Sequence, residues 1–80
     1  MEGFTVTDAE IREVIKKTPI SIISTAISEY IHDARNREIA HRKIVQNEPY
    51  EAIAGIYGLT PTQIKNIIRK ARRTIYEHLQ

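Results

Sequence analysis

The sequence contains no cysteine among its 80 residues. Without cysteine the chain has no disulfide framework, no thiol chemistry and no metal site built on thiolates. It also has no apolar run near the roughly 18 residues of a membrane-spanning helix, so we expect no membrane partner. A basic stretch followed by an apolar one, which marks a signal peptide, is missing from the N-terminus, and a cytoplasmic location is the default expectation.

Residue groupings typical of catalysis are missing as well. The three histidines, His32, His41 and His78, fall on different expected helices and lack the HxxxH or HExxH spacing of a metal site. No Ser/His/Asp grouping, glycine-rich phosphate loop or pair of carboxylates stands out. A chain of this length makes a single domain over residues 1–80, with no room for a separate catalytic domain. We therefore expect no enzyme, no catalytic residue, no metal and no cofactor.

The net charge of +2 hides an uneven distribution of charge along the chain. Residues 1–34 carry three basic and six acidic side chains, a net charge of −3, and residues 35–60 carry four basic and three acidic ones, a net charge of +1. Residues 61–80 carry five basic side chains and one acidic one, a net charge of +4. A basic C-terminal segment is expected of a surface that faces nucleic-acid phosphates, although solvated helix faces are often basic too.

The apolar residues are mostly isoleucine, and leucine is confined to Leu59 and Leu79. Isoleucine slightly favours strands, but its spacing here is helical almost throughout, and spacing is the stronger indicator. The sequence therefore predicts an all-α fold of about five helices, preceded by a loose arm at residues 1–6. The expected helices cover about 8–17, 20–34, 34–46, 50–57 and 61–79.

Capping residues indicate where the first three helices begin and end. Thr7 and Glu10 have the spacing of a capping box at the start of the first helix. Thr18, followed by proline, is expected to stop that helix and to cap the second one. Either Asp33 or Asn36 could cap the third helix, which a left-handed asparagine at position 47 could end.

These three helices each have one apolar face, which we expect to be buried. The residues are Ile11, Val14 and Ile15 in the first helix; Ile20, Ile22, Ile23, Ala26, Ile27, Tyr30, Ile31 and Ala34 in the second; and Ile39, Ile44 and Val45 in the third. The wide apolar stripe over 20–34 allows two interpretations. It is either part of the domain core or a dimer or partner surface on the N-terminal part, residues 1–34. Such stripes more often belong to the core, which is the use we favour.

Residues 50–79 have the pattern of two helices joined by a tight turn. The first helix carries an apolar face with the spacing i, i+3, i+4 and i+7, and the second repeats the same period. The residues are Tyr50, Ile53, Ala54 and Tyr57 in the first helix and Ile64, Ile67, Ile68, Ala71, Ile75 and Leu79 in the second.

The turn between these helices meets several independent local requirements. Gly58 suits a position where the chain reverses at positive φ, and Ala54 is small where the two helices would cross closely. Thr60 is a good N-cap for the second helix, Pro61 fits its first position, and Gln63 completes a capping box. The sequence therefore predicts a helix-turn-helix.

The second helix of this pair has a polar and basic face opposite its isoleucines. At 100° per residue, Thr62, Asn66, Arg69 and Arg73 lie on one line. In helix-turn-helix docking the first residues of the second helix meet base edges in the major groove. The side-chain types here suit that role, since Asn and Gln pair with adenine, Thr contacts thymine, and Lys and Arg read guanine. The expected base-reading residues are Thr62, Gln63, Lys65, Asn66 and Arg69, of which Lys65 and Arg69 could instead bind phosphate.

Other polar residues are expected to contact phosphates, which position a protein on DNA without specifying sequence. They are Arg42, Lys43, Tyr50, Lys70, Arg72 and Arg73. Structural uses stay open for some of these side chains. Gln63 could serve only the capping box, Tyr50 and Tyr57 could belong to the core, and Lys70 and Arg72 could be plain surface.

Four segments of the C-terminal half resemble the C-terminal DNA-reading region, or region 4, of bacterial sigma factors. They are Arg37-Glu38-Ile39, Pro49 to Ala54, Gly58-Leu59-Thr60 and Gln63 to Ala71. The resemblance covers about residues 35–76 and is specific for sigma-like and response-regulator helix-turn-helix domains as a superfamily. The layout of the whole chain also resembles small sigma-like regulators encoded by phages and mobile elements of low-GC bacteria.

The resemblance implies that residues 35–80 form a DNA-reading unit, with three departures from the family pattern. It implies that the base-reading residues above face DNA and that Arg72 and Arg73 lie near the DNA backbone or RNA polymerase. Pro49 stands at the usual Ser/Thr cap, and Gly55 stands where helix formers are usual. Nothing upstream resembles the promoter-melting region, so we do not expect a complete sigma factor.

Together the patterns predict a sequence-specific transcriptional regulator that binds double-stranded DNA. A lone helix-turn-helix makes few base contacts, so we expect added affinity from a homodimer, with half-sites about one DNA turn apart, or from RNA polymerase. Two alternatives remain. One is a protein-interaction module, a sigma mimic or anti-sigma-like chain that binds RNA polymerase or a sigma factor. The other is a DNA-packaging or replication adaptor of phage origin.

Overall fold

The computed structural model describes residues 6–79, which form five α-helices and one π-helix. In chain order these are α1 (Asp8–Lys17), α2 (Ile20–Tyr30), α3 (Ala34–Ala40), the π-helix η1 (His41–Val45), α4 (Tyr50–Tyr57) and α5 (Pro61–Leu79). The predicted all-α fold of about five helices is confirmed, and residues 6–79 contain no strand. The predicted arm at 1–6 lies outside the described residues except for Val6.

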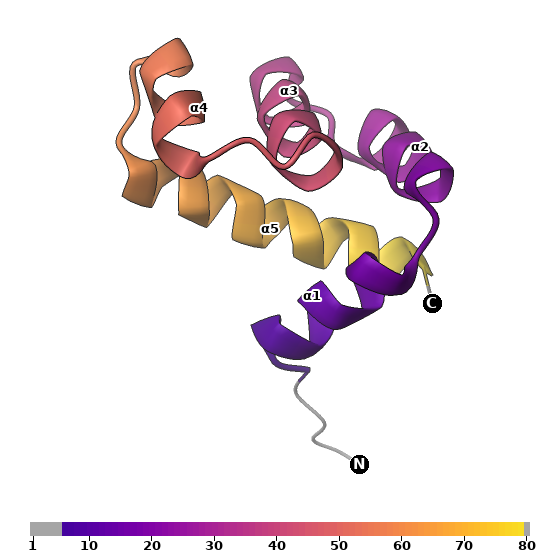
Figure 1. The fold of residues 1–80 in the computed structure, drawn as a ribbon. Helices are drawn as coiled ribbons and strands as arrows, with labels where there is room; N and C mark the ends of the chain where they lie inside the picture. Colours follow the sequence, from indigo (N-terminus) through magenta and orange to yellow (C-terminus); the bar gives the residue numbers. More distant parts are fainter. Residues whose placement is uncertain (1–5, 80) are drawn as a thin grey trace.

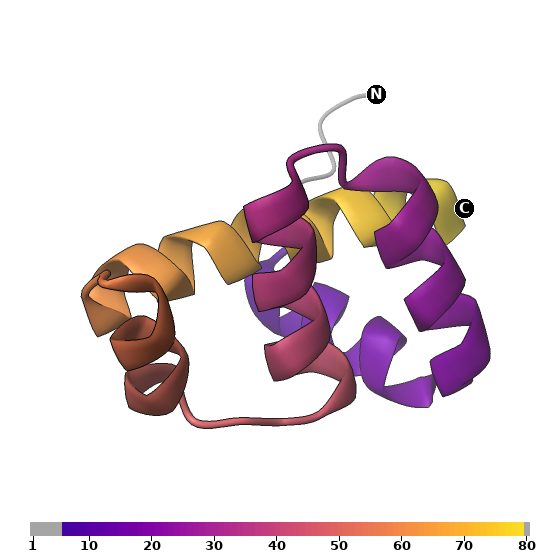
Figure 2. The same ribbon diagram turned by 90° about the horizontal axis from the view of Figure 1, so that it is seen from above.

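The long helix α5 is the axis of the molecule. It packs against α1, α2, α3 and α4. In Figure 1, α1 lies on one side of α5, while α2, α3 and α4 lie on the other side. Figure 2 shows that α4, the α3–η1 segment and α2 follow one another in a row along α5. The N-terminal end of α5 lies against the row but extends beyond α1 (Figure 1).

Two clusters of buried side chains form the core, and α5 belongs to both. The first cluster consists of Ile11, Ile15, Ile23, Ala26, Ile27, Ile31, Ala40, Ala71 and Ile75. The second consists of Ile39, Ile53, Ala54, Ile64 and Ile68. No polar or charged side chain is buried among the described residues. Burial of an isoleucine side chain stabilises the fold by about 1.5–3 kcal/mol, so these clusters provide the main driving force for folding.

The predicted caps of α1 and α3 are present. The side chain of Thr7 accepts a hydrogen bond from the Glu10 amide at 3.1 Å, and the Glu10 carboxylate accepts one from the Thr7 amide at 2.9 Å. Hydrogen bonds that the Thr7 amide and then the Thr7 hydroxyl donate to this carboxylate lower the pKa of Glu10. Asp33, rather than Asn36, caps α3, because its carboxylate accepts from the Asn36 amide at 2.9 Å. Asn47 adopts the expected left-handed conformation, with φ 56°.

Thr18 does not cap α2 as predicted. Its hydroxyl donates instead to the carbonyl of Val14, one turn back in α1, at 2.7 Å. The residue at the N-cap position of α2 is Pro19, which has no side-chain hydrogen bond to offer. A hydroxyl directly after a helix can satisfy a carbonyl at its end, and here that contact prevails over capping the next helix.

The predicted third helix, 34–46, is α-helical only as far as Ala40. The following turn is a π-helix, which has wider turns than an α-helix. Ile39 is fully buried as expected, whereas Ile44 and Val45 are only partly buried. In this position Ile44 contacts both core clusters. The widened turn therefore places one side chain at the junction of the two clusters.

The apolar faces of α1 and α2 are buried over a narrower width than predicted. Ile20 is 60% exposed, Ile22 48%, and both Tyr30 and Val14 37%. Ala34 is also exposed, at the start of α3. Helix α2 ends at Tyr30, and Ile31 is buried although its backbone is extended. Ile20 and Ile22 are exposed because α5, η1 and α3, the main neighbours of α2 among residues 6–79, do not cover that side of the helix.

Candidate nucleic-acid interface

The turn between α4 and α5 has the predicted geometry. Gly58 lies in the left-handed region with φ 67° and ψ 30°, and its amide donates to the carbonyl of Ala54. The amide of Leu59 donates to the same carbonyl at 3.0 Å, which satisfies the end of α4. Ala54 is itself 4% exposed and lies in the second core cluster, where a larger side chain would lack room.

A capping box sets the start of α5. The Thr60 hydroxyl accepts from the Gln63 amide at 3.1 Å, and the Gln63 side-chain oxygen accepts from the Thr60 amide at 2.9 Å. The predicted structural use of Gln63 is therefore real, and its side-chain oxygen is occupied. Its amide NH₂ group is the part of this side chain that remains to donate to a ligand.

The first turns of α5 combine a buried and an exposed side. Ile64 and Ile68 are completely buried, which fixes the rotation of the helix about its axis. The predicted base-reading residues Thr62, Gln63, Lys65, Asn66 and Arg69 are all exposed. The helix thus presents hydroxyl, amide and cationic groups on one exposed arc, held from behind by isoleucines.

The two edges of this arc face different parts of the molecule. Lys65 and Arg69 line a small hollow of about 150 Å³ next to Tyr50 and α1. On the other edge, Asn66 and Lys70 line a hollow of about 410 Å³ beside the turn between α2 and α3. The predicted base-reading residues therefore lie on one exposed surface, with the amide on one edge and the long cations on the other.

Tyr50 brings cations from two elements together. The Nζ atom of Lys43 lies 4.3 Å from the centre of the Tyr50 ring, and that of Lys65 lies 5.5 Å from it. These are distances at which a cation is attracted to the face of an aromatic ring. Lys43 also donates to the carbonyl of Glu48 at 3.1 Å. Tyr50 is half-buried and positions both lysines beside the exposed arc of α5.

Arg42 and Arg73, both predicted phosphate contacts, have acidic partners within the protein. Arg42 pairs with Glu48 at 3.3 Å, and hydrogen bonding to Tyr57 and Glu48 raises the pKa of Arg42. Arg73 pairs with Asp8 of α1 at 3.3 Å and donates to the carbonyl of Val6 at 3.2 Å. Arg42 therefore joins η1 to the segment before α4, and Arg73 joins α5 to the start of α1.

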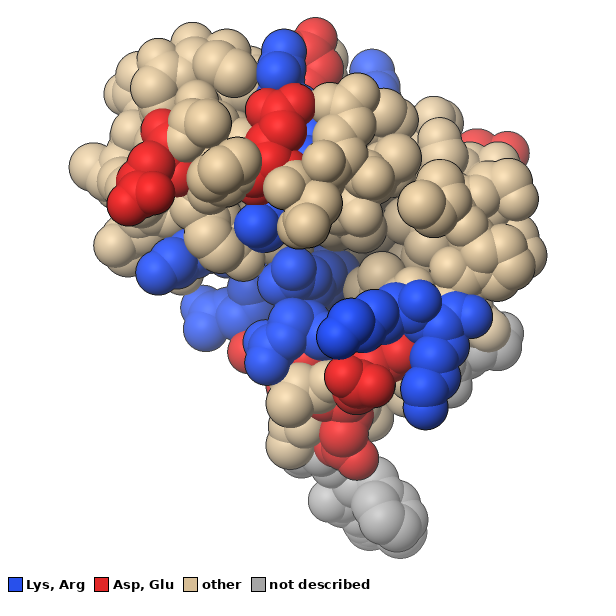
Figure 3. Space-filling model, viewed as in Figure 1, with Lys and Arg blue, Asp and Glu red and all other residues tan. Residues whose placement is uncertain are grey.

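Figure 3 shows a band of Lys and Arg side chains along the seam between α5 and α1. Two hollows, of about 330 and 150 Å³, lie along this seam and share Arg12 and Arg72. We name this surface the basic groove. Its cations come from α1, η1 and α5 and are Arg12, Lys16, Lys43, Lys65, Arg69 and Arg72. Asp8 and Glu13 also line it.

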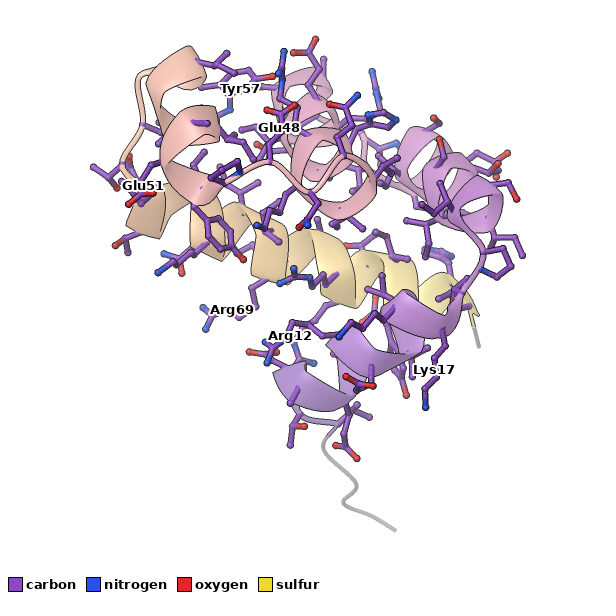
Figure 4. All side chains as sticks on the ribbon, viewed as in Figure 1. Arg12, Lys17, Glu48, Glu51, Tyr57 and Arg69 are labelled. Carbon is purple, nitrogen blue, oxygen red and sulfur yellow. The ribbon has the colours of Figure 1, made fainter. Side chains whose placement is uncertain are left out.

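Arg12 and Lys16 were missed in the sequence because they belong to a segment with a net negative charge. Their positions four residues apart place them on one flank of α1, and this spacing is a signal that could have been used. In Figure 4 Arg12 lies at the seam with α5, whereas Lys17 points away from it. The side of α5 on which α1 packs depends on contacts between distant segments, so the groove could not be derived from α1 alone.

Residues 6–79 contain neither a cluster of metal ligands nor a helix that could span a membrane. Within this range no three His, Cys, Asp or Glu side chains are grouped closely enough to hold a metal ion. Likewise, none of the described helices combines the length and the apolar character needed to cross a bilayer.

The geometry defines a class of structure, an all-α domain built around one long helix, with a helix-turn-helix at one end. Comparison of the chain with protein-family models, with curated proteins and with solved structures gives no match. The exposed arc of α5 and the basic groove beside it are therefore the features of the molecule that bear on its function.

Proposed function

We propose that this protein is a transcriptional regulator that binds double-stranded DNA sequence-specifically through α5 in the major groove. The observation that carries the proposal is the exposed arc at the start of α5, backed by the buried Ile64 and Ile68. A helix fixed in this way can hold polar groups against base edges, and it is bordered by a basic groove suited to the DNA backbone.

Each side chain on the arc has a role that its chemistry supports. Asn66 can form two hydrogen bonds with adenine, and Thr62 can contact the thymine methyl group. Arg69 and Lys65 can read guanine, while the free amide group of Gln63 can donate to a base acceptor. Lys43, Lys70 and Arg72 would bind phosphates, since they are cations beside the arc without an ion-pair partner among residues 6–79.

One helix reads few base pairs, so a useful affinity requires a second source of binding energy. A second copy of the chain would supply it through a paired half-site, and RNA polymerase would supply it through protein contacts. The resemblance to sigma factors supports polymerase as a partner. Both versions keep the same role for α5 and differ in the symmetry of the DNA site.

A second candidate function is a module that binds RNA polymerase or a sigma factor and uses DNA little. The observation that favours it is the exposed side of α2, where Ile20 and Ile22 are 60% and 48% exposed. Helix α2 has no lysine or arginine to bind DNA. This candidate leaves the basic groove without a use, and we therefore place it second.

Selection from a library of random-sequence duplexes at near-physiological salt tests the proposal. The retained duplexes are sequenced after several rounds, and we expect an enriched motif. An inverted repeat with half-sites about one helical turn apart would indicate a dimer, and a single half-site would indicate a monomer that needs another partner. Retention without enrichment, sensitive to salt, would contradict sequence reading and favour the second candidate.

A further inference from the structure

The basic groove has an excess of positive charge, with six cations against the two carboxylates of Asp8 and Glu13. The ion pairs among residues 6–79 join Arg42 to Glu48 and Arg73 to Asp8. None of the six cations of the basic groove takes part in them. Like charges held close together repel one another, and an anion placed between them relieves that repulsion. The groove is thus prepared for an anionic ligand.

Helix α1 is held firmly enough to be part of a binding site. Ile11 is 1% exposed and Ile15 is 8% exposed, and both pack in the cluster that contains Ala71 and Ile75 of α5. These contacts fix which flank of α1 faces the seam. As a result Arg12 and Lys16 stand opposite Arg72 and Lys43, although they are far apart in the sequence.

We propose that α1 is a second DNA-binding element, in which Arg12 and Lys16 hold the phosphate backbone beside the major groove that α5 enters. The inference rests on the proposed function and extends it beyond the helix-turn-helix. The cations are spread along the seam of α1, η1 and α5 instead of converging on one point, so they suit a chain of phosphates better than a single small anion. Lys65 and Arg69, which line the basic groove and also lie on the exposed arc of α5, would connect the phosphate-binding surface with the base-reading one.

Three single substitutions of the full chain test the role of α1. Arg12→Gln and Lys16→Gln each remove one positive charge from the basic groove. Lys17→Gln removes the same charge from the same helix, at a side chain that points away from the seam (Figure 4). Because all three side chains are exposed, we expect the melting temperatures to stay close to that of the unchanged protein.

Binding is measured to the selected duplex and to a scrambled duplex between 50 and 200 mM salt. A plot of log K against log salt has a negative slope, and each lost phosphate contact makes this slope shallower by about 0.9. In the double variant R12Q/K16Q the slope should be shallower by about 1.8. The factor by which its affinity drops between the two salt concentrations should therefore be about ten times smaller than for the unchanged protein. The ratio of affinities for the two duplexes should not change. Arg12→Lys should restore the slope that Arg12→Gln loses.

Interference by ethylation of single phosphates locates the contacts on DNA. We expect interference at backbone phosphates outside the base-reading positions, and its loss in R12Q/K16Q but not in Lys17→Gln. Inorganic phosphate serves as a competitor. Competition beyond its effect on ionic strength would indicate a small-anion pocket and overturn the inference. If R12Q/K16Q had the same salt slope and the same interference pattern as Lys17→Gln, the inference would be overturned as well.

The outcomes separate this inference from the proposed function. Altered slopes without an enriched motif would support backbone binding by α1 and reject sequence reading by α5. An enriched motif with unaltered slopes would support α5 and reject α1. A protein that binds neither duplex at low salt would reject both.

Discussion

At the residue scale, two glycines of the α4–α5 unit make opposite demands on the backbone. Gly58 has φ 67°, whereas Gly55 lies inside α4. A Cβ atom added at either position would have no atom within 4 Å beyond the neighbouring backbone, so sterically both positions are open. The effect of a substitution at each therefore comes from backbone conformation alone, which makes them a matched pair.

We predict that Gly58→Ala lowers and Gly55→Ala raises the free energy of unfolding. The left-handed conformation costs an alanine about 1–2 kcal/mol. Alanine in a helix interior is more favourable than glycine by about 0.5–1 kcal/mol, largely because glycine loses more conformational freedom on folding. Urea unfolding of both variants measures the two changes. Shifts of the same sign would contradict the left-handed turn at Gly58.

A second residue-scale prediction separates base reading from phosphate binding on one edge of α5. Asn66 and Lys70 are both exposed and line the same hollow. Asn66→Ala should lower the preference for the selected duplex over a scrambled one by about 1–3 kcal/mol, the usual value of a bidentate base contact. Lys70→Ala should weaken binding to both duplexes equally. Titrations of both duplexes provide the comparison, and a uniform loss for Asn66→Ala would remove it from the base-reading set.

Lys70 suits this comparison better than Arg73, another cation of this helix that is predicted to contact phosphates. Arg73 pairs with Asp8, so Arg73→Ala would also remove a link between α5 and α1. This ion pair is about half exposed, and exposed pairs contribute only about 0–1 kcal/mol to stability. A change in DNA affinity on mutation of Arg73 would nevertheless combine two effects.

At the element scale, a hydrogen bond across two helices makes stability depend on pH. The hydroxyl of Tyr57 in α4 donates to the Glu38 carboxylate in α3 at 2.7 Å. Burial and then this hydrogen bond raise the pKa of Tyr57 above its ordinary value of 10.0. The folded protein therefore holds the phenolic proton more strongly than the unfolded chain does. Its contribution to stability is complete below pH 10.0 and is lost as the pH rises above that value.

We predict that Tyr57→Phe makes the free energy of unfolding less sensitive to pH above 10.0. The substitution removes the group that must ionise, so the alkaline loss of stability becomes smaller. Urea unfolding at neutral pH and at about pH 11 gives the difference for each protein. Glu38→Gln should produce an intermediate effect, since it removes the charge beside the phenol but leaves its burial. Equal alkaline losses in all three proteins would contradict the role of Tyr57.

The elements that were predicted correctly are those whose ends depend on neighbouring residues. The α4–α5 turn follows from Gly58, Thr60 and Gln63, which satisfy backbone groups within four residues of themselves. The start of α1 follows from Thr7 and Glu10 for the same reason. Such contacts are determined by local sequence, because the partners are close whatever the rest of the chain does.

The features that were not predicted depend on contacts between distant segments. Spacing identified Ile11 and Ile15 as an apolar face but not the helix that covers it, so the placement of Arg12 beside α5 was missed. The π-helix after α3 places Ile44 between the two clusters, and no local signal in the sequence marks this turn. Ile22 has the same spacing as buried residues yet is 48% exposed, since α5, η1 and α3, the main neighbours of α2 among residues 6–79, leave it largely uncovered.

At the scale of the whole molecule, α5 connects the two core clusters. Ala71 and Ile75 lie in the cluster with α1 and α2, while Ile64 and Ile68 lie in the cluster with α4. Ile44 contacts both clusters as well. The helix that carries the exposed arc therefore cannot lose either cluster without losing its own support, and we expect the domain to unfold in one step.

Ile75→Ala tests this coupling from the end of α5 that is remote from the exposed arc. Ile75 is completely buried, and shortening it should lower the free energy of unfolding by about 2–5 kcal/mol. Ile22→Ala makes the same chemical change at a side chain that is 48% exposed and should cost much less. If Ile75→Ala leaves too little folded protein, Ile75→Val, with an expected cost of about 0.5–1.5 kcal/mol, takes its place.

Native-state hydrogen exchange of the Ile75 variant then compares amides of α1 and α4. In a single cooperative unit the slowest amides of both helices lose the same protection. Loss in α1 with unchanged protection in α4 would mean that the helix-turn-helix is stable without the N-terminal helices.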